Sequence, residues 1–221
     1  MKTLFKLVLH AILASSLAIG STQAFAQSQD PLWIKSVQQL QNAQKYVARD
    51  IEQKVEAERG DEKKAMVMTI RQTAWKGKDP VYSVISVDPP PKDGRQAKPL
   101  DFEDVLKSVY KIMLDDTAPV KRHDGQVIEG KAATMFEIDQ GGLQKFNAKI
   151  WVHPESGQVY HYNIQLAVPL LLELETQATL ADSEAGVRVV RTRDSKFKIK
   201  IPFKKGSGHL NETLSNWVLR P

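Results

Sequence analysis

Two glutamates on one predicted strand have a spacing close to that of a catalytic carboxylate pair. Glu173 and Glu175 are two positions apart, so in an extended chain their side chains point the same way, roughly 7 Å apart. Glycosidases use carboxylates at such distances for acid–base chemistry. The surrounding residues alternate between apolar and polar, however, and the glutamates belong to the polar half of that pattern. We therefore expect both to be acids on a solvent-facing strand surface.

Histidines are the other residues that could do chemistry, as metal ligands. His153 and His161 flank one predicted hairpin. If His153 pairs with Gln158, the two histidines fall on opposite faces of the sheet and cannot share an ion. The sequence has no nucleophile elbow, phosphate loop or dinucleotide fingerprint. We therefore expect no catalytic residue, no metal and no cofactor, and a protein that binds rather than an enzyme.

A row of lysines is the strongest charge feature. Lys196, Lys198 and Lys200 alternate with apolar residues, and Lys204 and Lys205 follow. On an edge strand such charges block aggregation between sheets. The other interpretation is electrostatic contact with an anionic membrane surface or an acidic partner. Nucleic acid is not expected as a partner, because the formal net charge is only +5.

The first 26 residues have the features of a secretory signal peptide. Lys2 and Lys6 precede an apolar run over residues 7–19, and Ala24–Ala26 forms a small-x-small cleavage site. The run is too short for a stable membrane anchor. The chain has no cysteine, which excludes disulfides and a lipid-modified N-terminal cysteine. We predict cleavage after Ala26, a single domain over residues 27–221 and a soluble periplasmic protein, with the oligomeric state left open.

The stretch from Leu166 to Phe203 organises the predicted fold. Alternate residues at its start share one face of a strand: Leu170, Leu172, Leu174, Thr176, Ala178 and Leu180. A return strand to Arg193 and a turn at Asp194–Ser195 are expected next. The following strand directs four apolar residues to one face: Phe197, Ile199, Ile201 and Phe203. Such a meander presents a long apolar surface that other elements must cover.

Two helices are predicted before this meander. One is capped by Asp30, with proline at its first position, and an apolar stripe carries it to Arg59. The second follows Asp101 as its N-cap. Strands are expected over residues 64–75 and 81–87, between the helices.

Strands are also expected over residues 127–139, 145–153 and 158–168. The C-terminal segment 210–219 is assigned to a strand that finishes the sheet edge. A helix is the alternative for that segment.

The hairpin around Pro154–Gly157 provides the predicted aromatic part of a site. Pairing His153 with Gln158 places Trp151 opposite Tyr160. One face then carries Trp151, Tyr160, Tyr162, Ile164 and Leu166, and the other carries Phe146, Ala148, Ile150, Val152 and Val159. With both faces apolar, the helices cover one, and the other closes as a barrel or stays open as a groove for an apolar guest. Ordinary core packing of the aromatic residues is the alternative.

Part of the sequence resembles a known family. Gly130–Ala132 leads into Met135–Asp139, and Ala148–Val159 follows. The second segment resembles the "lysine, apolar, tryptophan, apolar, Asp-Pro-Glu-Thr-Gly" hairpin of the periplasmic lipoprotein carriers and outer-membrane lipoprotein-sorting proteins, with His153 in place of the aspartate. The resemblance implies an α+β fold, in which a curved antiparallel meander forms an incomplete half-barrel. Two helices would cover its concave face, which holds acyl chains in that family.

We therefore expect a periplasmic, non-enzymatic protein that shelters an acyl chain, a lipoprotein or a similar amphiphile in an apolar groove. The predicted ligand-binding residues are Trp151, Tyr160, Tyr162, Leu170, Leu172, Leu174, Phe197, Ile199 and Ile201. The alternative is a ligand-free interaction or sensor module. It would regulate a protein partner through a sheet edge or through the exposed loop that begins with the three prolines Pro89–Pro91. A continuous apolar cavity favours the first, and a core filled by side chains favours the second.

Overall fold

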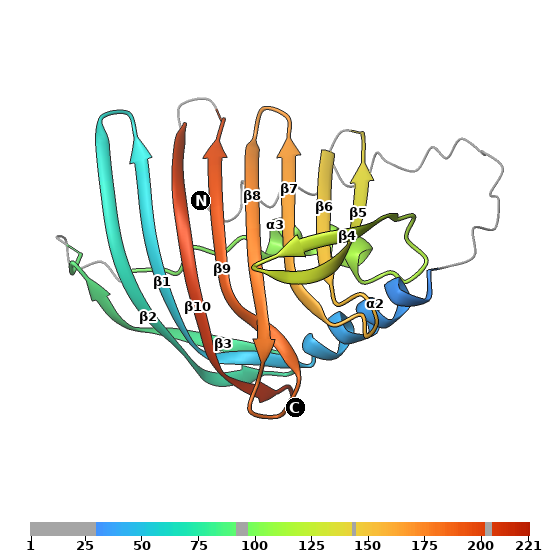
Figure 1. Ribbon diagram of the computed structural model, residues 1–221. Coiled ribbons are helices and arrows are strands. Elements are labelled where there is room, and N and C mark those ends of the chain that lie inside the picture. Colours follow the sequence, from blue (N-terminus) through green and yellow to red (C-terminus); the bar gives the residue numbers. More distant parts are fainter. Residues whose placement is uncertain (1–29, 92–96, 143–144, 202–204) are drawn as a thin grey trace.

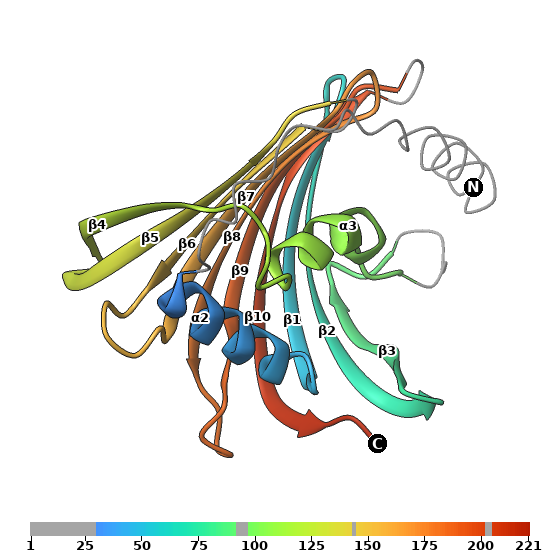
Figure 2. The same cartoon turned by 90° about the vertical axis from the view of Figure 1, so that its right-hand side faces the viewer.

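The computed structural model describes residues 30–91, 97–142, 145–201 and 205–221. They form one strongly curved antiparallel sheet of ten strands, with two helices on its concave side (Figures 1 and 2). This confirms the predicted α+β class and the incomplete half-barrel with two helices over its concave face. The predicted signal peptide, its cleavage after Ala26 and Phe203 lie outside the described residues.

The strands follow the spatial order β3-β2-β1-β10-β9-β8-β7-β6-β5-β4. Their bounds, in chain order, are β1 (Tyr46–Arg59), β2 (Glu62–Lys76), β3 (Asp79–Asp88), β4 (Lys121–Ile128), β5 (Lys131–Gln140), β6 (Lys145–Val152), β7 (Val159–Val168), β8 (Leu172–Asp182), β9 (Arg188–Ile199) and β10 (Gly206–Leu219). The helices are α2 (Pro31–Ala43) and α3 (Glu103–Met113). The C-terminal strand therefore joins two hairpin series, because β10 pairs with both β1 and β9.

The prediction that the first helix extends to Arg59 is wrong. Helix α2 ends at Ala43, and the chain continues as β1. The apolar residues Val47, Ile51 and Val55 are four apart, which fits one helix face, but a spacing of four also keeps them on one face of a strand. The predicted start is confirmed: Asp30 Oδ1 accepts the backbone N–H of Leu32 at 2.8 Å, as an N-cap should.

The N-cap of the second helix lies one residue later than predicted. Phe102 occupies the N-cap position of α3 without a side-chain cap hydrogen bond, so Asp101 is not the cap. The expected apolar face is confirmed, because Leu106, Val109 and Met113 are buried.

Two predicted strand boundaries in the second half are also wrong. The single strand over 127–139 is two strands, since Glu129 and Gly130 both have positive φ and form the β4–β5 turn. The turn at Asp194–Ser195 does not exist, and β9 runs straight through. Both polar side chains are satisfied within the sheet: Ser195 Oγ lies 2.9 Å from Thr176 Oγ1, and Asp194 Oδ2 lies 2.6 Å from His209 Nε2.

The β6–β7 hairpin has a different register from the predicted one. Trp151 pairs with His161 and Val152 with Val159, so Tyr160 is the extra residue of a bulge. The bulge shifts every later residue of β7 by one position. Tyr162 therefore lies opposite Ile150 on the concave face. The predicted pair of apolar faces becomes one apolar face and one largely polar face.

The lysine row does not protect a sheet edge. Strand β9 lies between β8 and β10 in the interior of the sheet, and the edges are β3 and β4. Lys196 and Lys198 stand opposite Glu175 and Glu173 of β8. The C-terminal segment is a strand, as predicted. It lies in the interior of the sheet and not at the predicted edge, because β1 pairs with it on the side away from β9.

Candidate functional site

The concave face of β5 to β9 is the candidate site. Its inward side chains are apolar and exclude water, and they include Phe136, Ile150, Ile164, Leu166, Leu174 and Leu180. The alternation predicted for β8 is confirmed, since Leu172, Leu174, Thr176, Ala178 and Leu180 are buried. The two helices supply the other wall, with Trp33, Val37, Leu106, Val109 and Met113 facing the sheet (Figure 2). In this structure these side chains fill the space between sheet and helices.

Helix α2 is attached to the sheet at its first turns. The rings of Trp33 and Phe136 pack with centroids 5.3 Å apart. Gly157 of the β6–β7 turn approaches the helix so closely that a Cβ there would lie 3.2 Å from the carbonyl oxygen of Leu32. Its φ of +72° independently favours glycine. The hairpin motif singled out in the sequence therefore serves to seat α2.

Apolar and polar contacts both hold helix α3. Its N-cap Phe102 packs on Phe197, with ring centroids 5.2 Å apart. The hydroxyls of Tyr110 and Tyr162 lie 3.4 Å apart. After the helix, the carbonyl of Leu114 accepts a hydrogen bond from the side-chain amide of Gln41 on α2 at 2.9 Å. Leu106, Val109 and Met113 add apolar contact with the sheet.

A side-chain amide anchors the segment that leads into α3. Gln53 of β1 is 3% exposed and pairs with the backbone of Leu100 in both directions. Its Nε2 donates to the Leu100 carbonyl at 2.9 Å, and its Oε1 accepts the Leu100 N–H at 3.2 Å. Two hydrogen bonds from one buried side chain thus fix the backbone three residues before the helix.

The same amide belongs to a polar strip across the concave face. Gln53 Nε2 also donates to Glu212 Oε1 at 2.9 Å, and Arg193 Nε donates to Glu212 Oε2 at 2.5 Å. Burial alone would lower the pKa of Arg193, but the carboxylate of Glu212 raises it overall. Burial also raises the pKa of the neighbouring Tyr162 hydroxyl. The strip is therefore an ion pair beside the Tyr162 hydroxyl, on a face whose other side chains are largely apolar.

The structure divides the predicted ligand-binding residues into two groups. Tyr162, Leu172, Leu174 and Phe197 are buried on the concave face, and Ile199 packs against them. Ile201 is partly buried just beyond β9. The other three lie elsewhere: Trp151, Tyr160 and Leu170.

Trp151 contacts His161 on the convex face, with ring centroids 5.4 Å apart. Tyr160, the bulge residue, lies under the ammonium group of Lys131 at 5.3 Å. Leu170 is exposed in the β7–β8 turn. The bulge explains the first two positions, because it separates Trp151 and Tyr160 from the face that carries Tyr162.

Three solved structures have a similar fold over most of the chain. A DUF1329 family protein from Desulfovibrio piger has a TM-score of 0.40 and 12% identity, over 85% of this chain and 91% of that chain. A LolA superfamily protein from Nitrosomonas europaea has 0.38 and 10%, over 89% and 95%. An outer membrane lipoprotein-sorting protein domain from Vibrio parahaemolyticus has 0.39 and 12%, over 85% and 93%. No family model and no curated protein matches the chain.

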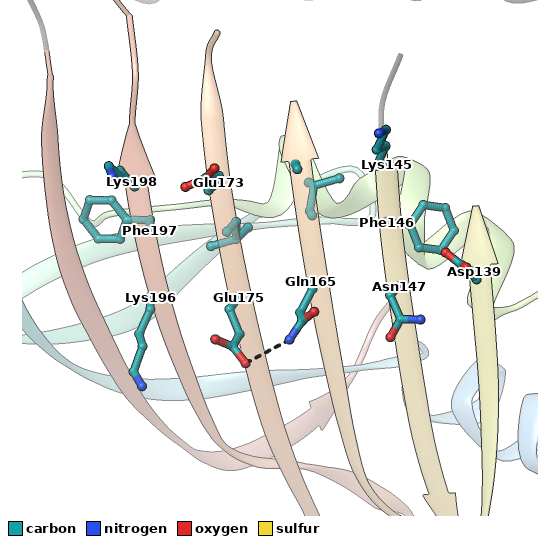
Figure 3. Close-up of a pocket in the computed structure, with 13 residues that line it drawn as sticks. Asp139, Lys145, Phe146, Asn147, Gln165, Glu173, Glu175, Lys196, Phe197 and Lys198 are labelled. Atoms are coloured by element: carbon teal, nitrogen blue, oxygen red, sulfur yellow. Dashed lines mark hydrogen bonds between the residues drawn. The ribbon is translucent and has the colours of Figure 1, made fainter. Parts of the chain in front are cut away.

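The convex face is polar and carries charges of both signs. Asn147, Gln165, Glu175 and Lys196 form a row across four neighbouring strands, beside a shallow hollow of about 540 Å³ (Figure 3). Glu173 and Glu175 belong to this face, as expected for surface acids. Within the described ranges, no group of three or more metal-ligating side chains is present. No helix in the same ranges is long and apolar enough to span a membrane.

The residues that sequence reasoning missed are Gln53, Arg193 and Glu212. Gln53 stands between the apolar residues Ile51 and Val55 on its strand, and Glu212 between Leu210 and Leu214. Arg193 lies opposite Glu212 on the neighbouring strand. A charged or amide side chain in such a position is a recognisable signal, because it must find a partner. The signal was hidden, since the segment with Gln53 was assigned to a helix and the residues around Arg193 to a turn.

Proposed function

We propose that this protein is a periplasmic carrier that shelters an acyl chain, or the acyl chains of a lipoprotein, between its concave sheet face and helices α2 and α3. One observation carries the proposal. The apolar concave face spans five strands, yet in the described part of the chain two short helices and the segment 97–102 cover it, not a second sheet. A guest that replaced α3 would meet the same apolar surface.

Entry of a guest would require α3 to move away from the sheet. The polar contacts that oppose this movement include the Gln53–Leu100 pair, the Gln41–Leu114 bond and the contact between the Tyr110 and Tyr162 hydroxyls. Each is worth about 1 kcal/mol or less. Burial of the guest contributes roughly 0.8 kcal/mol per methylene, which offsets these losses for a chain of ordinary length.

The proposed contact residues are six of the residues predicted from the sequence: Tyr162, Leu172, Leu174, Phe197, Ile199 and Ile201. Burial of the first four on the concave face, and the packing of Ile199 against them, support this choice. Ile201 follows just beyond β9. Trp151, Tyr160 and Leu170 would not touch a guest held there.

Binding can be tested with a dansyl-labelled fatty acid. We expect its fluorescence to rise when it binds the wild-type protein, and palmitate to displace it. The Gln53→Met variant keeps the side-chain volume but removes both bonds to Leu100, and with them the bond to Glu212. It should bind the dye about three- to tenfold more tightly, because a larger fraction of molecules has α3 displaced. Its melting temperature should fall at the same time.

Gln177→Met is the matched control, because Gln177 lies exposed on β8. It should change neither the dissociation constant nor the melting temperature. If the wild-type protein and Gln53→Met are both folded and neither responds to the dye, the carrier proposal fails.

We further propose that the chain is exported with cleavage after Ala26. The support is the charged start, the short apolar run and the Ala24–Ala26 site. Mass spectrometry of the protein recovered from the periplasm should show Gln27 at its N-terminus. A protein that keeps Met1 would contradict the proposed location.

An interaction module is the second candidate. The interior is filled by large side chains such as Trp33 and Phe136, which a module without a ligand requires. The edge strand β3 also has no charged residue from Val81 to Val87, and it exposes 40% of Val81 and 55% of Ile85. An uncharged edge is suited to pairing with a strand of a partner. Indifference to acyl ligands would favour this candidate.

A further inference from the structure

Four hairpin tips gather at one end of the sheet. They join β1 to β2, β5 to β6, β7 to β8 and β9 to β10, and the strands converge towards them (Figures 1 and 2). The β7–β8 and β9–β10 tips are linked, because the backbone N–H of Lys200 donates to the Leu171 carbonyl at 2.9 Å. The side chains at these two tips are therefore held close together.

The β7–β8 turn exposes a leucine in an unfavourable conformation. Leu171 N donates to the Val168 carbonyl at 3.1 Å, which makes Pro169 and Leu170 the two central residues of a β-turn. Leu170 has a φ of +62°, a position where glycine or asparagine is preferred. Its side chain is 80% exposed. Folding gains nothing from an apolar side chain here, so the leucine points to a role outside the fold.

Lysines lie on the neighbouring β9–β10 hairpin. Lys198, Lys200 and Lys205 line a hollow of about 440 Å³ between the β9–β10 tip and the β1–β2 turn. The one carboxylate in its lining is Glu58, which pairs with Lys63 at 2.8 Å. Glu173 beside the hollow pairs with Lys200, which is one of the three lining lysines. Lys63 and the three lining lysines still outnumber Glu58 and Glu173, so the hollow keeps a positive charge.

We propose that this end of the sheet docks on an anionic lipid bilayer. Leu170 enters the apolar layer, and Lys198, Lys200 and Lys205 contact the phosphate groups around it. One leucine that projects beside cations fits the boundary of a bilayer, where apolar and anionic layers lie within one side chain's length. A protein partner would need a larger apolar patch around the leucine. The proposal goes beyond acyl binding and is independent of it, since docking needs no guest.

Sedimentation with vesicles tests the proposal. The protein should bind vesicles of phosphatidylglycerol and phosphatidylethanolamine, bind vesicles of phosphatidylcholine far less, and dissociate as salt rises. Leu170→Asn should weaken binding about tenfold, from the lost burial of the leucine. The same variant should melt at an equal or higher temperature, because asparagine tolerates positive φ. Val127→Asn changes an exposed valine on the edge strand β4. This control should leave binding unchanged.

The lysines are tested by charge removal. Lys198, Lys200 and Lys205 changed together to glutamine should weaken vesicle binding by tenfold or more. The control changes Lys35 of α2 and Lys76 and Lys78 at the β2–β3 turn to glutamine. It loses the same charge away from these tips and should bind almost as wild type. Equal weakening by the two triple variants would overturn the proposal, since binding would then follow net charge alone. Full binding by Leu170→Asn would overturn it as well, because the leucine would then take no part.

Discussion

Leu172→Asp should lower the free energy of unfolding by about 4 kcal/mol or more, which is close to complete loss of fold for a typical domain. Leu172 is 6% exposed and lies on the concave face, where it pairs with Ile199. An aspartate there would have to bury a charge without a partner or remain protonated, and either outcome is unfavourable. Chemical denaturation followed by circular dichroism measures the effect.

The neighbouring substitution Glu173→Ala is its control. Glu173 is exposed on the convex face and pairs with Lys200 at the surface, so its loss should change stability by about 0.5 kcal/mol at most. Similar destabilisation by the two variants would show that the inward and outward residues of β8 are wrongly assigned.

Glu212→Leu should be the second strongly destabilising change, by about 3 kcal/mol. Glu212 is 3% exposed and is the ion-pair partner of Arg193. Its removal leaves a guanidinium group on the apolar concave face without its counter-charge. The side chain of Arg193 keeps 26% exposure, so the expected effect lies at the lower end of the range for buried pairs.

The double variant Glu212→Leu with Arg193→Leu separates the two contributions. With both charges gone, most of the lost stability should return, because no buried charge remains. Gln53 keeps its bonds to Leu100 in that background. If the double variant is as unstable as the single one, the ion pair itself stabilises the fold, and the strip is a structural requirement.

The strongest periodic segments could be assigned from the sequence. Strand β8 alternates without interruption from Leu172 to Leu180, and the structure buries its even-numbered residues as expected. The cap at Asp30 was equally readable, because an acid before proline satisfies the first N–H groups of a helix. These local signals indicate helices and antiparallel strands, whereas the half-barrel is what the resemblance of the hairpin to the carrier family implies.

Errors arose where two structures share one pattern. Val47, Ile51 and Val55 fit a helix and a strand equally, so the sequence predicts a helix where the structure has β1. Without β1, the predicted sheet lacks the strand that pairs with β10. From that error came the assignment of β9 and β10 to an edge, and with it the interpretation of the lysines as edge protection. The bulge at Tyr160 has no marker in the sequence, yet it decides that Trp151 and Tyr162 lie on opposite faces.

Photo-crosslinking with a fatty acid that carries a diazirine at the end of its chain tests the central claim most directly. The carrier account predicts that the label attaches to inward residues of the sheet and to α3, such as Ile164, Leu174 and Val109, and that excess palmitate prevents this. Attachment mainly to convex residues such as Trp151 and Glu175, or attachment that palmitate does not reduce, would contradict the account.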